Sequence, residues 1–341
     1  MRYIIVGAGA VGGAIGGRLA QSGREVALVA RGAHLDALRT EGLRLITPQG
    51  SELLRIPSYA HHEDLGPLRR DDVLVLAVKS QDAESVLRDW ANAAVSGGGT
   101  AGETLTVVCA QNGVANERVA LRYFANVVGM CVWLPSTHLQ PGTVIAHCAP
   151  QSGILTLGRY PRGGDDADAV LAAVAADLVG AHFDAPVVPD VMRWKYGKLL
   201  NNLANALEAL VGREQIEKAE DLWDAGRAEG VAVLDAAGIA YSTEEERRAV
   251  QGERMQVAPI ADVPRAGGST WQSLRRGGSV EADYLNGEIA LLGREHGVPT
   301  PVNDLMRREV TRLAQEGLQP GSATPEELRA QLAEGAGSAT R

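Results

Sequence analysis

The segment Gly7-Ala8-Gly9-Ala10-Val11-Gly12 constrains the fold of this chain more than any other feature. It has the spacing GxGxxG, it follows an apolar run at 2–6, and it opens a helical stretch that reaches about Gln21. In such a unit the first glycine permits a tight turn, the second lets a pyrophosphate approach, and the third lets helix pack on strand. We therefore predict a dinucleotide-binding loop; a glycine-rich turn of another α/β fold is the alternative.

Further apolar runs predict that this loop belongs to a parallel sheet. The runs at 25–30, 73–78 and 104–110 are typical of buried strands, and residues 83–94 have helical periodicity. Alternating apolar residues at 43–59 predict a small hairpin insertion. The pattern completes this half with strands near 126–133, 143–148, 154–158 and 182–187 and a helix near 165–179.

Helical periodicity dominates the second half of the chain. The expected helices lie near 190–212, 214–238, 243–256, 281–297 and 303–317, with a short one from 324. The fold class is therefore α/β, with a Rossmann-type doubly wound sheet in residues 1–188 and an all-α domain in residues 189–334. Residues 335–341 are expected to be disordered.

Composition excludes several classes of protein. The net charge of −9 without basic blocks, and only 5 Trp, 7 Tyr and 2 Phe, argue against nucleic-acid or anionic-membrane partners. No apolar run approaches the roughly 18 residues of a membrane span, and no signal peptide begins the chain. The three cysteines form no CxxC and are typical of buried thiols in a reducing, cytoplasmic compartment. No histidine or cysteine spacing fits a metal site, so we predict no metal.

Three residues at predicted strand ends are candidates for cofactor binding. The second strand ends at Arg31 without an acid, which favours the 2′-phosphate of NADP(H) over NAD(H). Lys79 follows the strand at 73–78, and Asn112 follows the strand at 104–110. The alternatives are a solvated arginine, a surface lysine and a plain Asn-Gly turn.

A polar stripe interrupts the apolar helix predicted at 190–212. At about 100° per residue, Lys198, Asn201, Asn202 and Asn205 share one face. Burying three carboxamides and an ammonium is costly without polar partners, so we interpret the stripe as the lining of a substrate cleft. A solvent-facing stripe is the alternative.

Two further residues are weaker candidates by position alone. Glu281 begins a predicted helix, where the helix dipole favours an acid in any case. Ser269 is a loop hydroxyl that could bind a carboxylate.

The order of these motifs resembles the ketopantoate reductase (2-dehydropantoate 2-reductase) family over about residues 1–318. The glycine fingerprint is unspecific, but the combination of KLxxN with ExDYxNG is specific. The resemblance implies a Rossmann-type domain followed by a helical domain. It rests on GAGAVG at 7–12, Arg31, Lys79, QNG at 111–113, KLLNN at 198–202, Ser269, EADYLNG at 281–287 and HGVPTPVND at 296–304.

The resemblance also implies roles for individual residues. The catalytic lysine of the family matches Lys198 and its conserved glutamate matches Glu281. The cofactor-side asparagine matches Asn112, and the substrate-binding asparagine and serine match Asn202 and Ser269.

One position departs from the family pattern. The second asparagine of the family would fall at 206, where this chain has Ala206, while an asparagine stands at Asn205. We take Asn205 as a further substrate-binding candidate. If the alignment is shifted by one residue, Asn201 and Asn205 match the two asparagines of the family, but Lys198 no longer matches its lysine. Lys195, three residues before Lys198, is expected to matter little for turnover.

The resemblance implies an enzyme, an NADP-dependent oxidoreductase that reduces ketopantoate to pantoate in the pathway to pantothenate and coenzyme A, with Lys198 as the general acid. One alternative is a related NADP-dependent dehydrogenase for another 2-oxo or 3-hydroxy acid. The other is a non-catalytic NADP(H)-binding sensor. The expected partner is a small 2-oxo acid, and a homodimer is left open.

Overall fold

The computed structural model describes residues 1–162, 168–261 and 267–338. Residue contacts divide the chain into two compact units, one made of Met1–Lys195 with Thr243–Val263, the other of Tyr196–Ser242 with Pro264–Arg341. The expected division at 188 therefore differs from the observed one in two ways. The first unit extends to Lys195, and it also includes a segment that the sequence analysis assigned to the helical domain.

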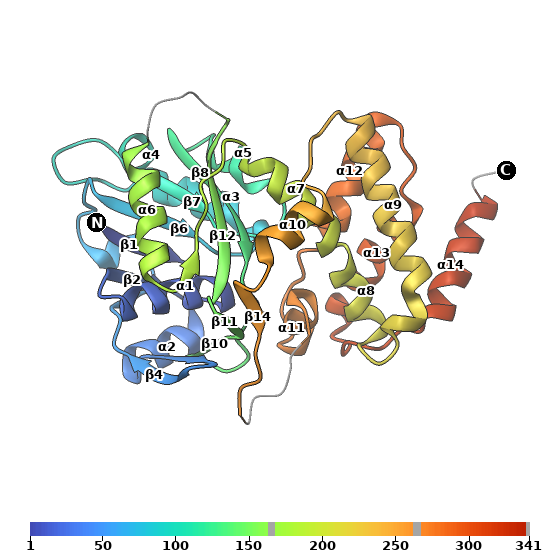
Figure 1. Cartoon of the computed structure of the whole chain (residues 1–341), viewed down its shortest axis with the longest axis horizontal. Coiled ribbons are helices and arrows are strands. Elements are labelled where there is room, and N and C mark those ends of the chain that lie inside the picture. The colour runs from blue at the N-terminus through green and yellow to red at the C-terminus, as the bar shows by residue number, and fades with distance from the viewer. Residues whose placement is uncertain (163–167, 262–266, 339–341) are drawn as a thin grey trace. The chain divides into compact units, whose positions relative to one another are not determined.

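An eight-stranded sheet forms the centre of the first unit (Figure 1). Its strands follow the order β13-β12-β8-β7-β6-β1-β2-β5, and all neighbours are parallel except β8 and β12. The chain goes from β1 to β2 on one side and then to β6 on the other side of β1, which makes the sheet doubly wound. The strands are β1 Arg2–Val6, β2 Glu25–Val29, β5 Ser58–Tyr59, β6 Asp72–Leu76, β7 Thr106–Cys109, β8 Asn126–Trp133, β12 Gly153–Tyr160 and β13 Phe183–Asp184.

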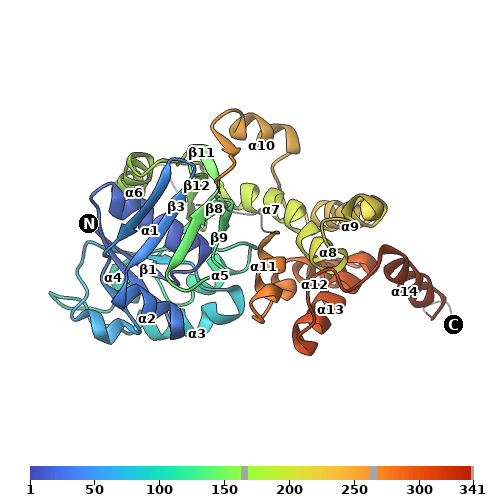
Figure 2. The same ribbon diagram turned by 90° about the horizontal axis from the view of Figure 1, so that it is seen from below.

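Helices cover both faces of this sheet, because its strands are apolar on both sides. Tyr3 and Ile5 of β1 belong to one buried cluster, and Ile4 and Val6 belong to another, as the two-residue period of a strand requires. The first face is covered by α1 (Ala10–Gln21) and α6 (Ala169–Gly180). The second is covered by α3 (Ser80–Ala91), α4 (Ala101–Thr104) and α5 (Asn116–Ala120). Figure 2 shows α3 and α6 on opposite sides of the strands.

A second, four-stranded sheet packs against α1. The predicted hairpin at 43–59 is present as β3 (Leu43–Thr47) and β4 (Gly50–Leu54), which pair antiparallel. It is part of a larger sheet, because β3 also pairs with β10 (Thr143–Ala146), which in turn pairs with β9 (Ser136–Thr137). The remaining elements of this region are α2 (Gly32–Thr40) and the short helix η1 (His62–Leu65).

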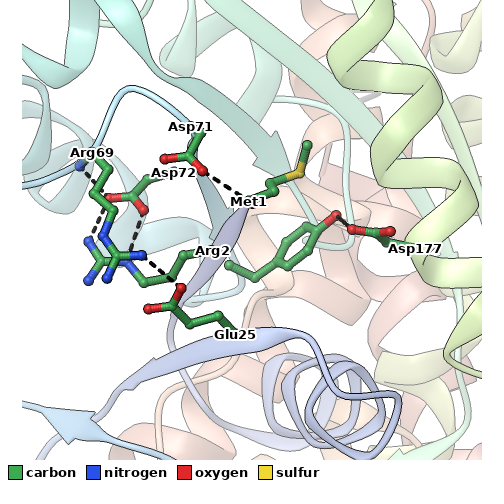
Figure 3. A network of polar contacts seen from close by, with 8 residues as sticks. Met1, Arg2, Glu25, Arg69, Asp71, Asp72 and Asp177 are labelled. Carbon is green, nitrogen blue, oxygen red and sulfur yellow. Dashed lines mark hydrogen bonds and ion pairs between the residues drawn. The ribbon is translucent and has the colours of Figure 1, made fainter.

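A polar network joins the amino ends of the strands (Figure 3). Arg2 donates two hydrogen bonds to the carboxylate of Asp72, at 2.9 and 2.6 Å, and thereby links β1 to β6. The Tyr3 hydroxyl donates to Asp177 of α6 at 2.7 Å. This network lies at the edge opposite to the predicted cofactor residues, so we interpret it as structural.

The second unit is helical throughout its described residues. Apolar side chains of α8, α9 and α13 form its core, including Leu207, Leu222 and Leu305. Figure 2 shows α12 and α13 packed side by side. The helices from residue 191 onward are α7 Val191–Asn202, α8 Ala204–Val211, η2 Ile216–Ala219, α9 Glu220–Ala236, α10 Glu244–Gln251, α11 Ser269–Arg275, η3 Ala282–Tyr284, α12 Asn286–His296, α13 Pro301–Glu316 and α14 Pro325–Ser338.

Three details of the expected helices were wrong. The helix predicted at 190–212 is interrupted at Leu203, which lies in a turn between α7 and α8. The helix predicted at 243–256 ends at Gln251, and β14 (Met255–Val257) then pairs antiparallel with β11 (Cys148–Pro150). Pairing with a distant strand decided the conformation of this short segment, which helical periodicity alone could not anticipate.

The third correction concerns the C-terminus. Residues 335–338, which were expected to be disordered, continue α14, which runs from Pro325 to Ser338 although its sequence contains Gly335 and Gly337. Positions 339–341 of that prediction lie outside the described residues. So do positions 165–167 of the helix predicted at 165–179, whose described part is α6.

Candidate functional site

The carboxyl ends of four parallel strands lie level with one another in the first unit. Val6 of β1 pairs with Val29 of β2 and Leu76 of β6, and Leu76 pairs with Cys109 of β7. The strand order reverses beside β1, and open α/β sheets bind ligands at such a point. The segments that follow these strand ends contain the predicted cofactor residues, namely Gly7–Gly12, Arg31, Lys79 and Asn112.

The glycine loop has the shape that a dinucleotide requires. Gly7 has φ +103°, and a Cβ there would lie 2.7 Å from the backbone nitrogen of Val78. A Cβ on Gly12 would lie 2.1 Å from the carbonyl oxygen of Gly7, so only glycine lets α1 approach the loop. A Cβ on Gly9 would meet nothing within 4 Å. The first turn of α1 has no acidic side chain and no capping side chain, so its amide N–H groups can donate hydrogen bonds to a phosphate.

Arg31 lies at the carboxyl end of β2. It is the N-cap residue of α2, directly after β2, and its side chain is 89% exposed. Its guanidinium forms an ion pair with Asp82 in the first turn of α3, at 3.0 Å. Lys79 is the N-cap residue of α3 and is half-buried.

Asn112 lies in a loop that is tied to its neighbour. The side-chain amide of Asn116 donates to the carbonyl oxygen of Asn112 at 3.4 Å and to the hydroxyl of Ser80 at 3.0 Å. Asn116 therefore joins the end of β7 to the first residue of α3. Gly113 has φ +77°, as a tight turn requires, so the turn interpretation holds for the backbone whatever the side chain of Asn112 binds.

A buried polar cluster beside this loop was missed by the sequence analysis. Lys195 of α7 forms an ion pair with Glu117 of α5, and its ammonium also donates to the carbonyl oxygen of Gln111 at 3.2 Å. The Lys195 and Glu117 side chains are 2% and 0% exposed. The chain has only four lysines, and this scarcity was the sequence signal that could have marked Lys195. Lys195 is a core residue of the first unit, and its small expected effect on turnover stays a prediction.

The buried pair also affects a nearby thiol. Burial raises the pKa of Cys109 well above its usual value, and the Glu117 carboxylate raises it further. All three cysteines of the chain are buried and free, as the sequence analysis predicted.

The polar stripe of the second unit is half-buried. Lys198 and Asn202 on α7 and Asn205 on α8 are of intermediate exposure, while Leu199 and Leu200 between them are fully buried. The side-chain nitrogen of Asn202 is buried and has no hydrogen-bond partner among the described residues. An unpaired buried donor is costly, so this nitrogen is a good candidate for binding a ligand.

Because the helix breaks at Leu203, Asn205 belongs to the polar stripe and Ala206 does not. Ala206 is 2% exposed and packs in the helical core, whereas the amide of Asn205 donates to the hydroxyl of Ser269 at 3.4 Å. One turn later, Glu208 accepts the backbone N–H of Gly268 at 3.0 Å. Ser269 is the first residue of α11; the expectation that it lies in a loop was wrong.

Glu281 and the later residues of the EADYLNG motif do not lie on one continuous helix. Glu281 is half-buried at the start of η3, and α12 begins only at Asn286. The buried amide of Asn286 donates to the carbonyl oxygen of Leu203 at 3.2 Å and to Asn303 at 3.0 Å. The asparagines of EADYLNG and HGVPTPVND therefore hold the helices together at the α7–α8 break.

Among the described residues, no group of three or more His, Cys, Asp or Glu side chains is arranged to hold a metal ion. None of the helices within them is long and apolar enough to cross a membrane.

A doubly wound sheet with this glycine loop, joined to a helical unit with a half-buried Lys-Asn stripe, is the architecture of a nicotinamide-dependent oxidoreductase. The family model described as "Ketopantoate reductase PanE/ApbA" matches residues 3–162, and its C-terminal counterpart matches residues 190–314. The chain therefore belongs to the ketopantoate reductase family of NAD(P)H-dependent oxidoreductases, and its fold class is the one predicted.

Relatives and solved structures agree with this assignment. The chain is 29% identical to a 2-dehydropantoate 2-reductase of Mesorhizobium japonicum, with 93% of this chain and 98% of the relative covered. It is also 29% identical to the enzyme of that name from Halobacterium salinarum, with coverages of 92% and 99%.

Among solved structures, a PanE/ApbA family ketopantoate reductase of Ralstonia eutropha JMP134 matches with 28% identity, a TM-score of 0.74 and coverages of 93% and 99%. A D-mandelate dehydrogenase, solved with NADH and anilino(oxo)acetate, matches in fold with 22% identity, a TM-score of 0.76 and the same coverages.

Proposed function

We propose that this enzyme reduces ketopantoate to pantoate and uses NADPH as its reductant. The names of the relatives support the substrate, and the residues of the second unit support the chemistry. The observation that carries the proposal is the buried, unpartnered amide nitrogen of Asn202, one turn after Lys198 on α7. It offers a donor to an anionic or carbonyl oxygen next to a residue that can deliver a proton.

Lys198 is the proposed general acid. When bound, reduced nicotinamide supplies the hydride to the 2-oxo carbon. Negative charge then grows on the carbonyl oxygen, and Lys198 donates a hydrogen bond and finally its proton to that oxygen. A positioned general acid contributes roughly 10²–10⁴-fold to the rate. Glu281 is proposed to orient the Lys198 ammonium.

The remaining polar residues of the second unit are proposed to bind the substrate. The hydrogen bond from Asn205 to Ser269 orients both side chains, and Glu208 fixes the backbone before Ser269. Two amides and a hydroxyl held in this way suit the carboxylate and hydroxyl of a small oxo acid, because all can donate hydrogen bonds.

The cofactor preference is proposed from the first unit. The amides at the start of α1 would bind the pyrophosphate, and Lys79 and Asn112 would contact the cofactor from neighbouring strand ends. Arg31 is proposed to select NADPH, because β2 ends without the acid that binds a free ribose 2′-hydroxyl.

A second candidate is a different 2-oxo acid. Ala206 stands at the position of the expected second asparagine and is buried in the helical core, so the nearest asparagine is Asn205 and its spacing from Asn202 differs from the family pattern. The fold match to a D-mandelate dehydrogenase makes an aromatic 2-oxo acid a sensible comparison.

The test is a substrate panel. Oxidation of NADPH and of NADH is followed by absorbance with ketopantoate, phenylglyoxylate and a series of aliphatic 2-oxo acids. We expect the highest kcat/KM for ketopantoate with NADPH. A higher value for another acid would support the second candidate. Cofactor binding without turnover of any acid would indicate the sensor instead of an enzyme.

A further inference from the structure

His34 joins two segments that are far from it in sequence. It lies in the first turn of α2, three residues after Arg31. Its Nε2 is 2.8 Å from the carbonyl oxygen of Ala8, inside the glycine loop. Its Nδ1 is 2.9 Å from the backbone nitrogen of Gly142, in the turn between β9 and β10. The ring of His138 lies against it, with the ring centroids 4.2 Å apart.

The partners fix the tautomer of His34. The carbonyl of Ala8 can only accept, so Nε2 must carry a proton and donate it. The N–H of Gly142 can only donate, so Nδ1 must be unprotonated and accept it. Both hydrogen bonds therefore exist together only in the neutral ring with its proton on Nε2.

The bond to Ala8 determines the direction of the next amide. In a trans peptide the carbonyl of one residue and the N–H of the next point in opposite directions. With the Ala8 carbonyl directed at His34, the N–H of Gly9 is directed away from His34. The N–H groups of Gly7 and Ala8 are already bonded to the carbonyl of Val29, at 3.1 and 3.0 Å. Gly9 is also the loop residue whose absent Cβ leaves open space.

We propose that His34 is a positioning residue for the cofactor: it holds the Ala8 carbonyl so that the Gly9 amide is presented to the pyrophosphate. This inference rests on the proposed function, because it assumes a dinucleotide at the glycine loop. The pyrophosphate is common to NADPH and NADH, so loss of His34 affects both cofactors. Loss of Arg31 affects only NADPH.

Two substitutions separate the two hydrogen bonds of His34. Glutamine places a donor near the position of Nε2 and can still bond to Ala8, whereas asparagine reaches only the position of Nδ1. We expect H34N to weaken binding of both NADPH and NADH about three- to tenfold, the effect of one lost hydrogen bond. H34Q should bind both within about twofold of wild type. The exposed His296, at the end of α12, provides the control H296N, with no expected effect.

The readouts are cofactor Kd by fluorescence titration, steady-state kinetics and the Tm of each apo protein. In H34N we expect a raised cofactor KM with unchanged kcat and unchanged KM for the oxo acid. Wild-type affinity in H34N would overturn the inference. Equal losses in H34N and H34Q, with a lowered Tm in both, would also overturn it, because the ring would then be only a packing residue. Wild-type protein that binds neither cofactor would refute the proposed function itself, and the inference with it.

Discussion

The ammonium of Lys195 and the carboxylate of Glu117 form an ion pair in which neither side chain is more than 2% exposed. The ammonium has a second partner in the carbonyl of Gln111, while Oε2 of Glu117 has none among the described residues. A buried charge that loses its partner is much less stable than a buried pair. The pair therefore supports the loop after β7, from which Asn112 is proposed to contact the cofactor.

Lys195→Ala should lower the stability of the first unit by about 3–5 kcal/mol, because it leaves Glu117 charged and unpaired in the interior. The measurement is urea unfolding of the apo protein, with the exposed Lys218→Ala as the matched control. The double variant Lys195→Met with Glu117→Leu should recover most of the loss. An unchanged unfolding midpoint in Lys195→Ala would show that the pair is not important for stability.

Arg31→Ala should weaken NADPH binding at least about tenfold and leave NADH binding unchanged, because only a 2′-phosphate needs the guanidinium. Its ion pair with Asp82 is exposed, so the Tm should not change. Asp82→Asn supplies the opposite control: it removes a negative charge near the same phosphate, so NADPH should bind as tightly or more tightly. An equal loss of both cofactors in Arg31→Ala would mean that Arg31 is structural.

The sequence was sufficient to predict those parts of the fold that depend on local pattern. Apolar runs gave the strands whose carboxyl ends precede Gly7, Arg31, Lys79 and Asn112, and the order of elements gave the doubly wound sheet. Which side of α7 would be buried could not be derived in the same way. Lys195 and Lys198 lie one turn apart on one helix, and only the packing of α5 against α7 makes Lys195 internal.

Contacts between residues far apart in the chain could not be predicted from the sequence either. The ring of His34 bonds to positions 8 and 142, and nothing in the local pattern of either segment indicates the other. At the break, the carbonyl of Leu203 accepts a hydrogen bond from the amide of Asn286, which lies on another helix. A constant 100° rotation per residue therefore could not decide between Asn205 and position 206.

Glu281→Gln should lower kcat while the protein stays folded and binds NADPH with unchanged affinity. The proposed reason is that a neutral amide orients the Lys198 ammonium less firmly than a carboxylate does. Stopped-flow turnover and NADPH titration measure the two quantities on the same preparation. An unchanged kcat would mean that Glu281 does not orient Lys198 and only has a structural role at the start of η3.

The contribution of Glu246 to stability should depend on pH. Two hydrogen bonds from Arg193, at 2.8 and 2.6 Å, and one from the backbone of Thr243 lower the pKa of Glu246 from 4.5 to about 2. A pKa lowered by folding stabilises the protein above pH 4.5, and this contribution is lost as the pH falls towards 2. The Tm of Glu246→Gln should therefore be below wild type at pH 7, and the gap should close at acid pH. A gap that is constant with pH would contradict this.

The role of Lys198 as the proton donor to the reduced carbonyl can be measured as the kcat of Lys198→Ala with NADPH and the best oxo acid of the panel. We expect a loss of at least about 10²-fold, as for a missing general acid, with unchanged Tm and NADPH affinity. Lys218→Ala, an exposed lysine of the same unit, should keep the wild-type rate. A Lys198→Ala enzyme that turns over at the wild-type rate would contradict the mechanism and the substrate roles assigned to Asn202, Asn205 and Ser269.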